Sequence, residues 1–267
     1  MRRRSARNCT VAALVLVVVA TAACSSSSST ANTTSTTGER LSGSITVSAA
    51  SSLTAVFTNL ASSFQRLHPG TSVAFNFGSS GALATQIVSG APADVFASAS
   101  PSNMATVQAA HLVTGVPVPF ARNRLEIVVK PGNPLGIHSL VDLDKAAVVG
   151  ICVSTAPCGS TAEEALAKAG VTLAVSKVSR GANVDATLAE VTTGDADVGI
   201  VYVTNAVTVG RLGVAVPIRP SQNVSTRYPI AVLTTSANRA LASAWVAYVL
   251  GPAGRGTLLR ADFLPPG

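Results

Sequence analysis

The sequence has few charged and few aromatic residues. Charged residues make up 12% of the 267 and aromatic residues 4%, and the histidines are limited to His68, His111 and His138. These histidines are scattered and lie near no cysteine or acidic cluster, so we expect no metal site. The chain has no G-x-S-x-G, H-E-x-x-H or G-x-x-x-x-G-K motif, and no Ser/His/Asp set at strand ends. We therefore expect no enzymatic activity and no cofactor.

No apolar run is long enough to span a bilayer, which takes about 20 residues. The longest at the N-terminus, Val11–Ala20, follows four arginines and precedes three small residues and Cys24. This order is typical of a bacterial lipoprotein signal, in which the cysteine is acylated and becomes the mature N-terminus. An ordinary cleavable signal with an incidental cysteine is the alternative. We predict a signal peptide at 1–23, lipidation at Cys24, and export to the outer face of the cytoplasmic membrane.

The segment after Cys24 is almost purely serine and threonine up to Thr37, and we interpret 24–42 as a flexible tether. About 225 residues remain, enough for one large domain or two lobes with their own cores. Loss of the four signal-peptide arginines lowers the formal charge from +7 to +3. No dense basic cluster is left, so nucleic acid is not an expected partner. The lipid is the expected contact with the membrane.

Two cysteines, Cys152 and Cys158, remain in the folded part. Their spacing in an exported protein favours a small-loop disulfide over a metal site. Two buried free thiols are the competing interpretation.

Apolar periodicity alternates between strand and helix from residue 43 onward, which predicts an α/β fold with mainly parallel sheets. The expected strands are 44–48, 73–77, 93–98, 124–130, 147–153, 197–203, 215–218 and 228–234. The expected helices are 53–67, 82–90, 101–112, 139–145, 160–169, 183–193, 237–250 and 253–262. In open α/β sheets, ligands bind beyond the carboxyl ends of strands, where helices begin.

Two successive strand-to-helix turns place adjacent serines at a helix start, Ser51-Ser52 and Ser79-Ser80. Unpaired N–H groups and the positive end of the dipole make such starts suitable for anions. Simple N-capping by serine is the alternative. The loop 152–161 offers further helix N-terminal amides. Tyr202 ends an apolar strand and, taken alone, reads as a core or interface aromatic.

Several blocks in this order resemble the periplasmic molybdate-binding proteins (ModA), over residues 43 to 264. They are Ile45–Leu53, Gly78–Leu83, Gly90–Phe96, Gly199–Tyr202, Tyr228–Val232 and Leu250–Pro252.

The resemblance implies a two-lobed, hinged type II periplasmic-binding-protein fold with an oxyanion in the cleft. Lobe 1 would hold 43–121 plus 226–267, and lobe 2 would hold 122–225. By local matching, the ligand donors fall on the hydroxyls of Ser52, Ser80 and Tyr202 and on the amides of Cys158 and Val184. Cys158 departs from the small residue that is common in the family at its position.

A site of hydroxyl and amide donors suits a fully deprotonated dianion, because a phosphate proton would be left without an acceptor. The resemblance implies capture of molybdate or tungstate and delivery to an ABC transporter permease by a monomer. A binding protein for sulfate or another tetrahedral oxyanion is the alternative. A lipid-anchored hydrolase and a purely structural surface lipoprotein are less favoured.

Overall fold

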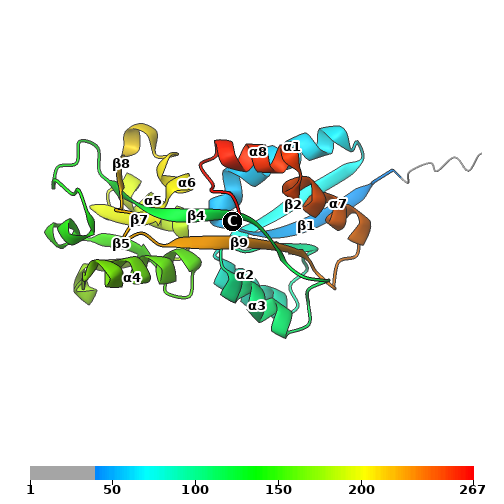
Figure 1. The fold of residues 1–267 in the computed structure, drawn as a ribbon, viewed down its shortest axis with the longest axis horizontal. Coiled ribbons are helices and arrows are strands. Elements are labelled where there is room, and N and C mark those ends of the chain that lie inside the picture. The colour runs from blue at the N-terminus through cyan, green and yellow to red at the C-terminus, as the bar shows by residue number, and fades with distance from the viewer. Residues whose placement is uncertain (1–39) are drawn as a thin grey trace, which may run out of the picture. The chain divides into compact units, whose positions relative to one another are not determined.

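A nine-stranded sheet runs through the part of the chain that the computed structural model describes, residues 40–267 (Figure 1). Hydrogen-bonded neighbours follow the order β2–β1–β3–β9–β4–β7–β5–β6, and β8 pairs with β4 off this path. The strands are β1 (Gly43–Ala50), β2 (Thr71–Gly78), β3 (Val95–Ala97), β4 (Val118–Val129), β5 (Val149–Cys152), β6 (Val178–Gly181), β7 (Val198–Tyr202), β8 (Val214–Pro217) and β9 (Ser225–Val232). The predicted signal peptide, Cys24 and most of the tether lie outside the described residues.

Helices flank the sheet on both faces. They are α1 (Thr54–Leu67), α2 (Ser80–Val88), α3 (Pro101–Ala109), α4 (Pro157–Ala169), α5 (Val184–Thr193), α6 (Val203–Ala206), α7 (Arg239–Leu250) and α8 (Pro252–Arg260). Short 3₁₀ helices are η1 (Ser51–Leu53), η2 (Leu140–Lys145), η3 (Val175–Lys177) and η4 (Gly210–Leu212). Around β1–β3, helices α1, α7 and α8 lie on one face and α2 and α3 on the other (Figure 1).

The expectation of mainly parallel sheets is wrong. The β1–β2, β1–β3, β5–β6 and β5–β7 pairs are parallel, but β3–β9, β4–β9, β4–β7 and β4–β8 are antiparallel. The antiparallel pairs all involve β4 or β9. Hydrophobic periodicity reports which residues are extended but not which direction a neighbouring strand runs, so these pairings were not readable from the pattern.

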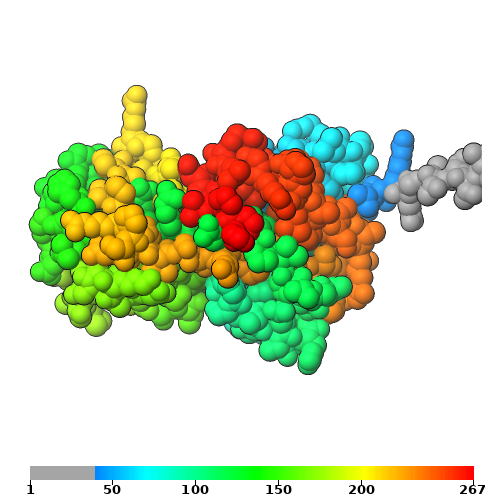
Figure 2. Space-filling view, viewed as in Figure 1, coloured from blue at the N-terminus to red at the C-terminus, as the bar shows by residue number. Residues whose placement is uncertain are grey.

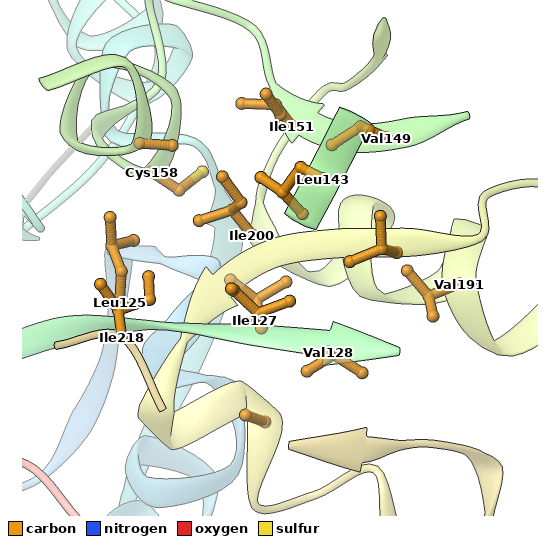
Figure 3. Packing of buried hydrophobic residues seen from close by; sticks show 14 of the residues in the cluster. Leu125, Ile127, Val128, Leu143, Val149, Ile151, Cys158, Val191, Ile200 and Ile218 are labelled. Carbon is orange, nitrogen blue, oxygen red and sulfur yellow. The ribbon is translucent and has the colours of Figure 1, made fainter. Parts of the chain in front are cut away.

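Strand β4 contributes to two of the three hydrophobic cores in residues 40–267, and the third core packs α2 and α3 against β3 and β9. One of the two cores that share β4 contains buried residues of β1, α1 and α7, with Trp245 in edge contact with the rings of Phe57 (5.7 Å) and Phe64 (5.5 Å). The other lies around β4, β5 and β7, where Ile127 and Ile200 pack together (Figure 3). We use "lobe 1" and "lobe 2" below for the segments that the sequence analysis proposes; their independent motion stays a prediction.

Strands β4 and β9 join these segments, and both joining strands begin earlier than the sequence predicts, at Val118 instead of Arg124 and at Ser225 instead of Tyr228. Pro119 weakens the strand pattern because proline cannot donate to a ladder. The structure accommodates it with a register shift between Pro119 and Ala121. Across this stretch Ala121 pairs with Tyr228, so the two strands run side by side where the chain passes between the lobes.

The C-terminal residues cross the joining strands. Arg122 and Leu264 exchange backbone hydrogen bonds of 2.9 and 2.8 Å, and the Arg122 guanidinium donates to the carbonyl of Pro265 at 2.8 Å. Phe263 is buried against the Tyr228 ring, with ring centroids 5.4 Å apart. The C-terminal residues accordingly lie near the middle of the visible face (Figure 2).

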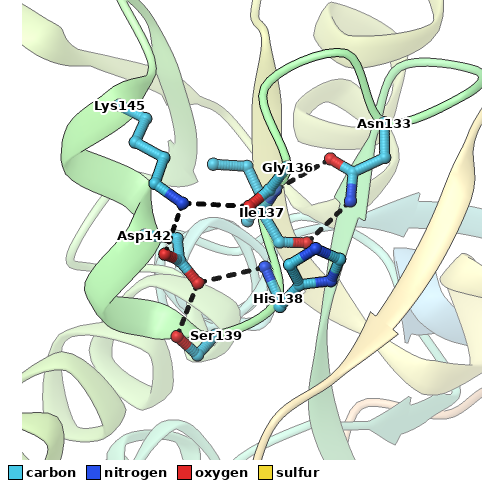
Figure 4. Close-up of polar contacts among 7 residues, drawn as sticks. All are labelled: Asn133, Gly136, Ile137, His138, Ser139, Asp142 and Lys145. Atoms are coloured by element: carbon cyan, nitrogen blue, oxygen red, sulfur yellow. Dashed lines mark hydrogen bonds and ion pairs between the residues drawn. The ribbon is translucent and has the colours of Figure 1, made fainter.

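Polar contacts close the long connection that leads into η2 (Figure 4). The Asn133 side chain donates to the carbonyl of Ile137 and accepts from its amide. Asp142 accepts from the Ser139 hydroxyl at 2.7 Å and pairs with Lys145 at 2.6 Å. These hydrogen bonds and the Lys145 ammonium lower the pKa of the Asp142 carboxyl far below its usual range.

Candidate functional site

The five predicted ligand-binding residues line one small cavity between the lobes, with a volume of about 10 Å³. Its lining is Ala50, Ser51, Ser52, Gly78, Ser79, Ser80, Ala99, Pro157, Cys158, Asn183, Val184 and Tyr202. The exposed fractions of the predicted five are 8% for Ser52, 0% for Ser80, 3% for Cys158, 2% for Val184 and 1% for Tyr202. The structure thus brings all five together.

Helix N-termini form most of the cavity wall. Ser80 is the first residue of α2, Val184 is the first residue of α5, and Cys158 is the second residue of α4. Amides of a first helical turn have no acceptor within their own helix. The dipole of each helix adds partial positive charge at the same end. The lining contains no Lys or Arg, so its affinity for anions would come from amides and hydroxyls.

Helix α4 begins at Pro157, three residues earlier than the sequence predicts. Proline is favoured at the first helical position because it has no N–H to leave unpaired there. The expected long loop 152–161 is therefore short, and the Cys158 amide belongs to a helix start. The next residue must be small, since a Cβ on Gly159 would lie 2.1 Å from the Val153 carbonyl oxygen.

The paired serines of α2 have different roles. Ser79 is the N-cap, and its hydroxyl accepts from the Ala82 amide at 3.2 Å. The Ser80 hydroxyl accepts from the Ala99 amide at 2.9 Å. Simple N-capping therefore accounts for Ser79 but not for Ser80. With its oxygen already accepting, Ser80 keeps its own proton available to a ligand.

The serines of η1 do not cap a helix with their side chains. The Ser51 carbonyl accepts from the Thr54 hydroxyl at 2.6 Å. The Ser52 hydroxyl lies 2.9 Å from the phenol oxygen of Tyr228, a residue that the sequence analysis did not place in the site. Tyr228 is fully buried in β9, at the crossing between the lobes.

Tyr202 ends β7 with its ring buried and its hydroxyl without a hydrogen-bond partner among residues 40–267. The neighbouring Thr161 hydroxyl donates instead to the Pro157 carbonyl at 2.6 Å. Burial raises the pKa of the Tyr202 phenol well above its usual range and Tyr228 raises it further, while the nearby Thr161 hydroxyl opposes the shift. The phenol is thus a permanent donor at physiological pH. A buried hydroxyl without a partner costs about 1–3 kcal/mol, which a ligand oxygen could offset.

Cys152 and Cys158 are joined by a disulfide, with their Cα atoms 5.7 Å apart. Cys152 is the last residue of β5, and the Thr187 hydroxyl of α5 contacts its sulfur at 3.3 Å. The bridge connects the strand end directly to the first turn of α4. It therefore restrains the position of the Cys158 amide in the cavity wall.

Two contacts join the lobes beside the cavity. The α2 backbone at Gly81 lies so close to Thr155, in lobe 2, that a Cβ on Gly81 would be 2.3 Å from the Thr155 carbonyl oxygen. On η1's side, the Thr54 hydroxyl donates to the Asp185 carboxylate at 3.5 Å, and Asn205 donates to it at 2.6 Å. Desolvation raises the pKa of the Asp185 carboxyl, and these two hydrogen bonds oppose the shift.

The lining residues include no histidine or carboxylate that could act as a general base. No cluster of His, Cys, Asp or Glu in residues 40–267 has the arrangement needed to hold a metal ion. Within the same residues, no helix combines the length and the apolar character that crossing a lipid bilayer requires. The lining can donate hydrogen bonds to a small anion from neutral groups.

Known proteins resemble this chain over most of its length. A family model described as bacterial extracellular solute-binding protein matches residues 45–263. The molybdate-binding protein ModA of Mycobacterium tuberculosis is 40% identical over 224 residues, which cover 84% of this chain and 85% of that protein.

Two solved structures share the fold. The Azotobacter vinelandii periplasmic molybdate-binding protein has a TM-score of 0.73 at 20% identity, covering 84% of this chain and 100% of that chain. The sulfate-binding protein SubI of Mycobacterium tuberculosis has a TM-score of 0.74 at 21% identity, covering 83% and 86%. The chain belongs to the bacterial extracellular solute-binding proteins, within the ModA family that its sequence motifs resemble.

Proposed function

We propose that the protein captures molybdate, and with it tungstate, outside the cytoplasm and delivers it to the permease of an ABC importer. The observation that carries the proposal is a cavity lined by serine hydroxyls and helix N-terminal residues and by Tyr202, whose hydroxyl has no hydrogen-bond partner among residues 40–267. Ser52, Ser80 and Tyr202 would donate through hydroxyls, and Cys158 and Val184 through helix N-terminal amides. A fully deprotonated tetrahedral dianion matches this set because every one of its oxygens can accept.

The family relationship supports the same ligand class. Curated relatives named molybdate-binding protein ModA match this chain over most of their length. A sulfate-binding protein shares the fold, so sulfate is the alternative ligand within the class. The two anions differ mainly in size, and the binding measurement distinguishes them.

Calorimetric titration of the mature protein with molybdate, tungstate, sulfate and phosphate tests the proposal. We expect tight binding of molybdate and tungstate, weaker binding of sulfate, and the weakest binding of phosphate. Tyr202→Phe keeps the ring and removes the hydroxyl, and it should weaken molybdate binding about 10- to 100-fold. Absence of binding to all four anions would refute the proposed function.

We also propose that the protein is a monomer anchored through acylated Cys24, so that membrane contact is through the lipid alone. Small residues before a cysteine at the end of an apolar segment support this part of the proposal. Cys24→Ser should release the protein from the membrane fraction. Equal membrane retention of wild type and variant would exclude the lipid anchor and leave the anion proposal intact.

A further inference from the structure

The Ser52 hydroxyl belongs to a buried chain of hydrogen bonds that runs through both joining strands. Ser52 contacts the Tyr228 hydroxyl at 2.9 Å, and Tyr228 contacts the side-chain nitrogen of Asn123 at 3.4 Å. The same nitrogen donates to the Thr204 hydroxyl at 2.8 Å. Asn123 and Tyr228 are both 0% exposed, so water cannot substitute for these partners.

The direction of the chain is fixed at Asn123. Its side-chain oxygen accepts from the Arg124 backbone amide at 2.9 Å, and an amide N–H can only donate. The other end of the Asn123 side chain is therefore the NH₂ group, which has no lone pair to offer. Both Thr204 and Tyr228 must accept from it.

Donation by Asn123 in turn orients the Tyr228 proton. The described residues offer that proton one hydrogen-bond acceptor, the Ser52 oxygen. Burial raises the pKa of the Tyr228 phenol, so it remains protonated. Phe120, Tyr202 and Phe263 surround the ring with centroids 6.1, 6.3 and 5.4 Å away, which keeps the hydroxyl in place.

We propose that Tyr228, held by Asn123, is a positioning residue that makes Ser52 a hydrogen-bond donor to the ligand and so excludes anions that carry a proton. Ser52 accepts from Tyr228, and its own proton is left to point into the cavity. Ser80 has the equivalent arrangement through the Ala99 amide. Both serines then direct their protons at the ligand, so neither oxygen turns a lone pair toward a proton that the anion carries. This inference rests on the proposed oxyanion-binding function and assigns its selectivity to two hinge residues.

The test is Tyr228→Phe, which keeps the ring packing and removes the hydroxyl. Without it the Ser52 hydroxyl can rotate, and its oxygen can accept the proton of a phosphate ion. We expect molybdate affinity to fall about tenfold, since an oriented bond to a charged group is weakened. Phosphate affinity, measured by competition against bound molybdate, should stay the same or rise. The ratio of the two affinities should therefore shrink by tenfold or more.

Three further variants complete the experiment. Tyr248→Phe removes the hydroxyl of a tyrosine whose ring packs against Phe64, with ring centroids 5.3 Å apart, and it should change neither affinity. In a Ser52→Ala background, Tyr228→Phe should have no additional effect on molybdate binding. Asn123→Ala should shift the ratio in the same direction by a smaller factor, and it replaces Tyr228→Phe if thermal unfolding shows that variant to be misfolded.

The outcomes separate the two levels of the proposal. Equal loss of molybdate and phosphate affinity in Tyr228→Phe, an undiminished effect in the Ser52→Ala background, or no effect at all would overturn the positioning role. If wild-type protein binds none of the tetrahedral oxyanions, the proposed function itself fails.

Discussion

Gly81→Ala should block closure of the lobes without removing any proposed ligand donor. The added methyl group would lie 2.3 Å from the Thr155 carbonyl oxygen and 3.2 Å from its carbon. Real Cβ atoms do not approach other heavy atoms closer than about 3.0 Å, so the lobes would have to separate here by about 0.7 Å or more. Both contacted atoms belong to the backbone, which cannot turn aside as a flexible side chain could.

The size of the effect follows from hydrogen-bond geometry. A bond of about 2.9 Å that lengthens by 0.7 Å reaches about 3.6 Å, which is no longer a hydrogen bond. The Cys158 amide lies three residues from Thr155 and is the donor most directly displaced. Loss of one bond to a charged ligand is worth about 1.5–3 kcal/mol, so molybdate affinity should fall about 10- to 150-fold.

Stability should move in the opposite direction. Alanine is favoured over glycine within a helix by about 0.5–1 kcal/mol, and the open form that we propose for the ligand-free protein would give the new methyl group room. Urea unfolding without ligand should therefore show unchanged or slightly higher stability. Gly256→Ala in α8 is the matched control, since its Cβ would meet only the end of the Arg260 side chain at 3.4 Å. Wild-type molybdate affinity in Gly81→Ala would refute the closure argument.

The remaining predictions concern the wall of the site, its disulfide, the η2 connection and the ligand-driven motion. Ser80→Ala should weaken molybdate binding about 10- to 100-fold, because one hydroxyl donor is lost. It should also lower the free energy of unfolding by about 1–3 kcal/mol, because the buried Ala99 amide loses its acceptor. Calorimetry measures the first effect and urea unfolding the second, and unchanged values would exclude the assignment. Thiol titration of the denatured, unreduced mature protein should find no free thiol at Cys152 or Cys158, and reduction should cost about 2 kcal/mol of stability for so small a loop; two free thiols would contradict the bridge. Asp142→Asn should lower the unfolding midpoint at neutral pH, and the difference from wild type should shrink as pH falls below 3.8. A carboxyl with a depressed pKa contributes its stability above the unfolded-state pKa and loses it on protonation. A difference that does not change with pH would contradict the stabilising role of the Asp142 carboxylate. Small-angle scattering should show a more compact particle with saturating molybdate than without, and identical profiles would exclude ligand-driven closure.

The sequence was sufficient for the features that depend on local pattern. Periodicity and turn residues located the start of α5 at Asn183, where its side chain caps the helix by accepting from Ala186 at 3.0 Å, but they placed the starts of α2 and α4 two and three residues too late. The α/β fold class followed from alternating apolar periodicity, and the family and its two-lobed fold followed from motifs in a fixed order. The five ligand positions were carried over from the resemblance, and their assignment stays a prediction until binding is measured.

Features that depend on distant partners were not readable from the pattern. Ser52 and Tyr228 are separated by 176 residues, and Asn123 and Tyr228 by 105. Tyr228 sits in an ordinary strand pattern and Asn123 follows an arginine, so neither has a local signal of a polar role. Gly81 has no local signal of a tight contact, and only its approach to Thr155 shows why a side chain there is excluded. Pairing of β4 with β9 was hidden for the same reason, because register depends on contacts between segments far apart in the chain.

The lack of formal charge in the cavity and the need for closure are connected. Each helix N-terminus carries roughly +0.5 of an elementary charge, so α2, α4 and α5 together offer about +1.5 toward a dianion. Helix α2 belongs to lobe 1, whereas α4 and α5 belong to lobe 2, and an anion in an open cleft would meet only part of this field. Partial charges are also screened by water and become effective where the site is buried. A lysine or arginine in the cleft would attract the anion whether or not the lobes closed. Because the neutral donors are divided between the lobes, full affinity requires the donors of both lobes. The proposed binding and the proposed closure therefore occur together. A membrane partner could then recognise the bound protein by its closed shape.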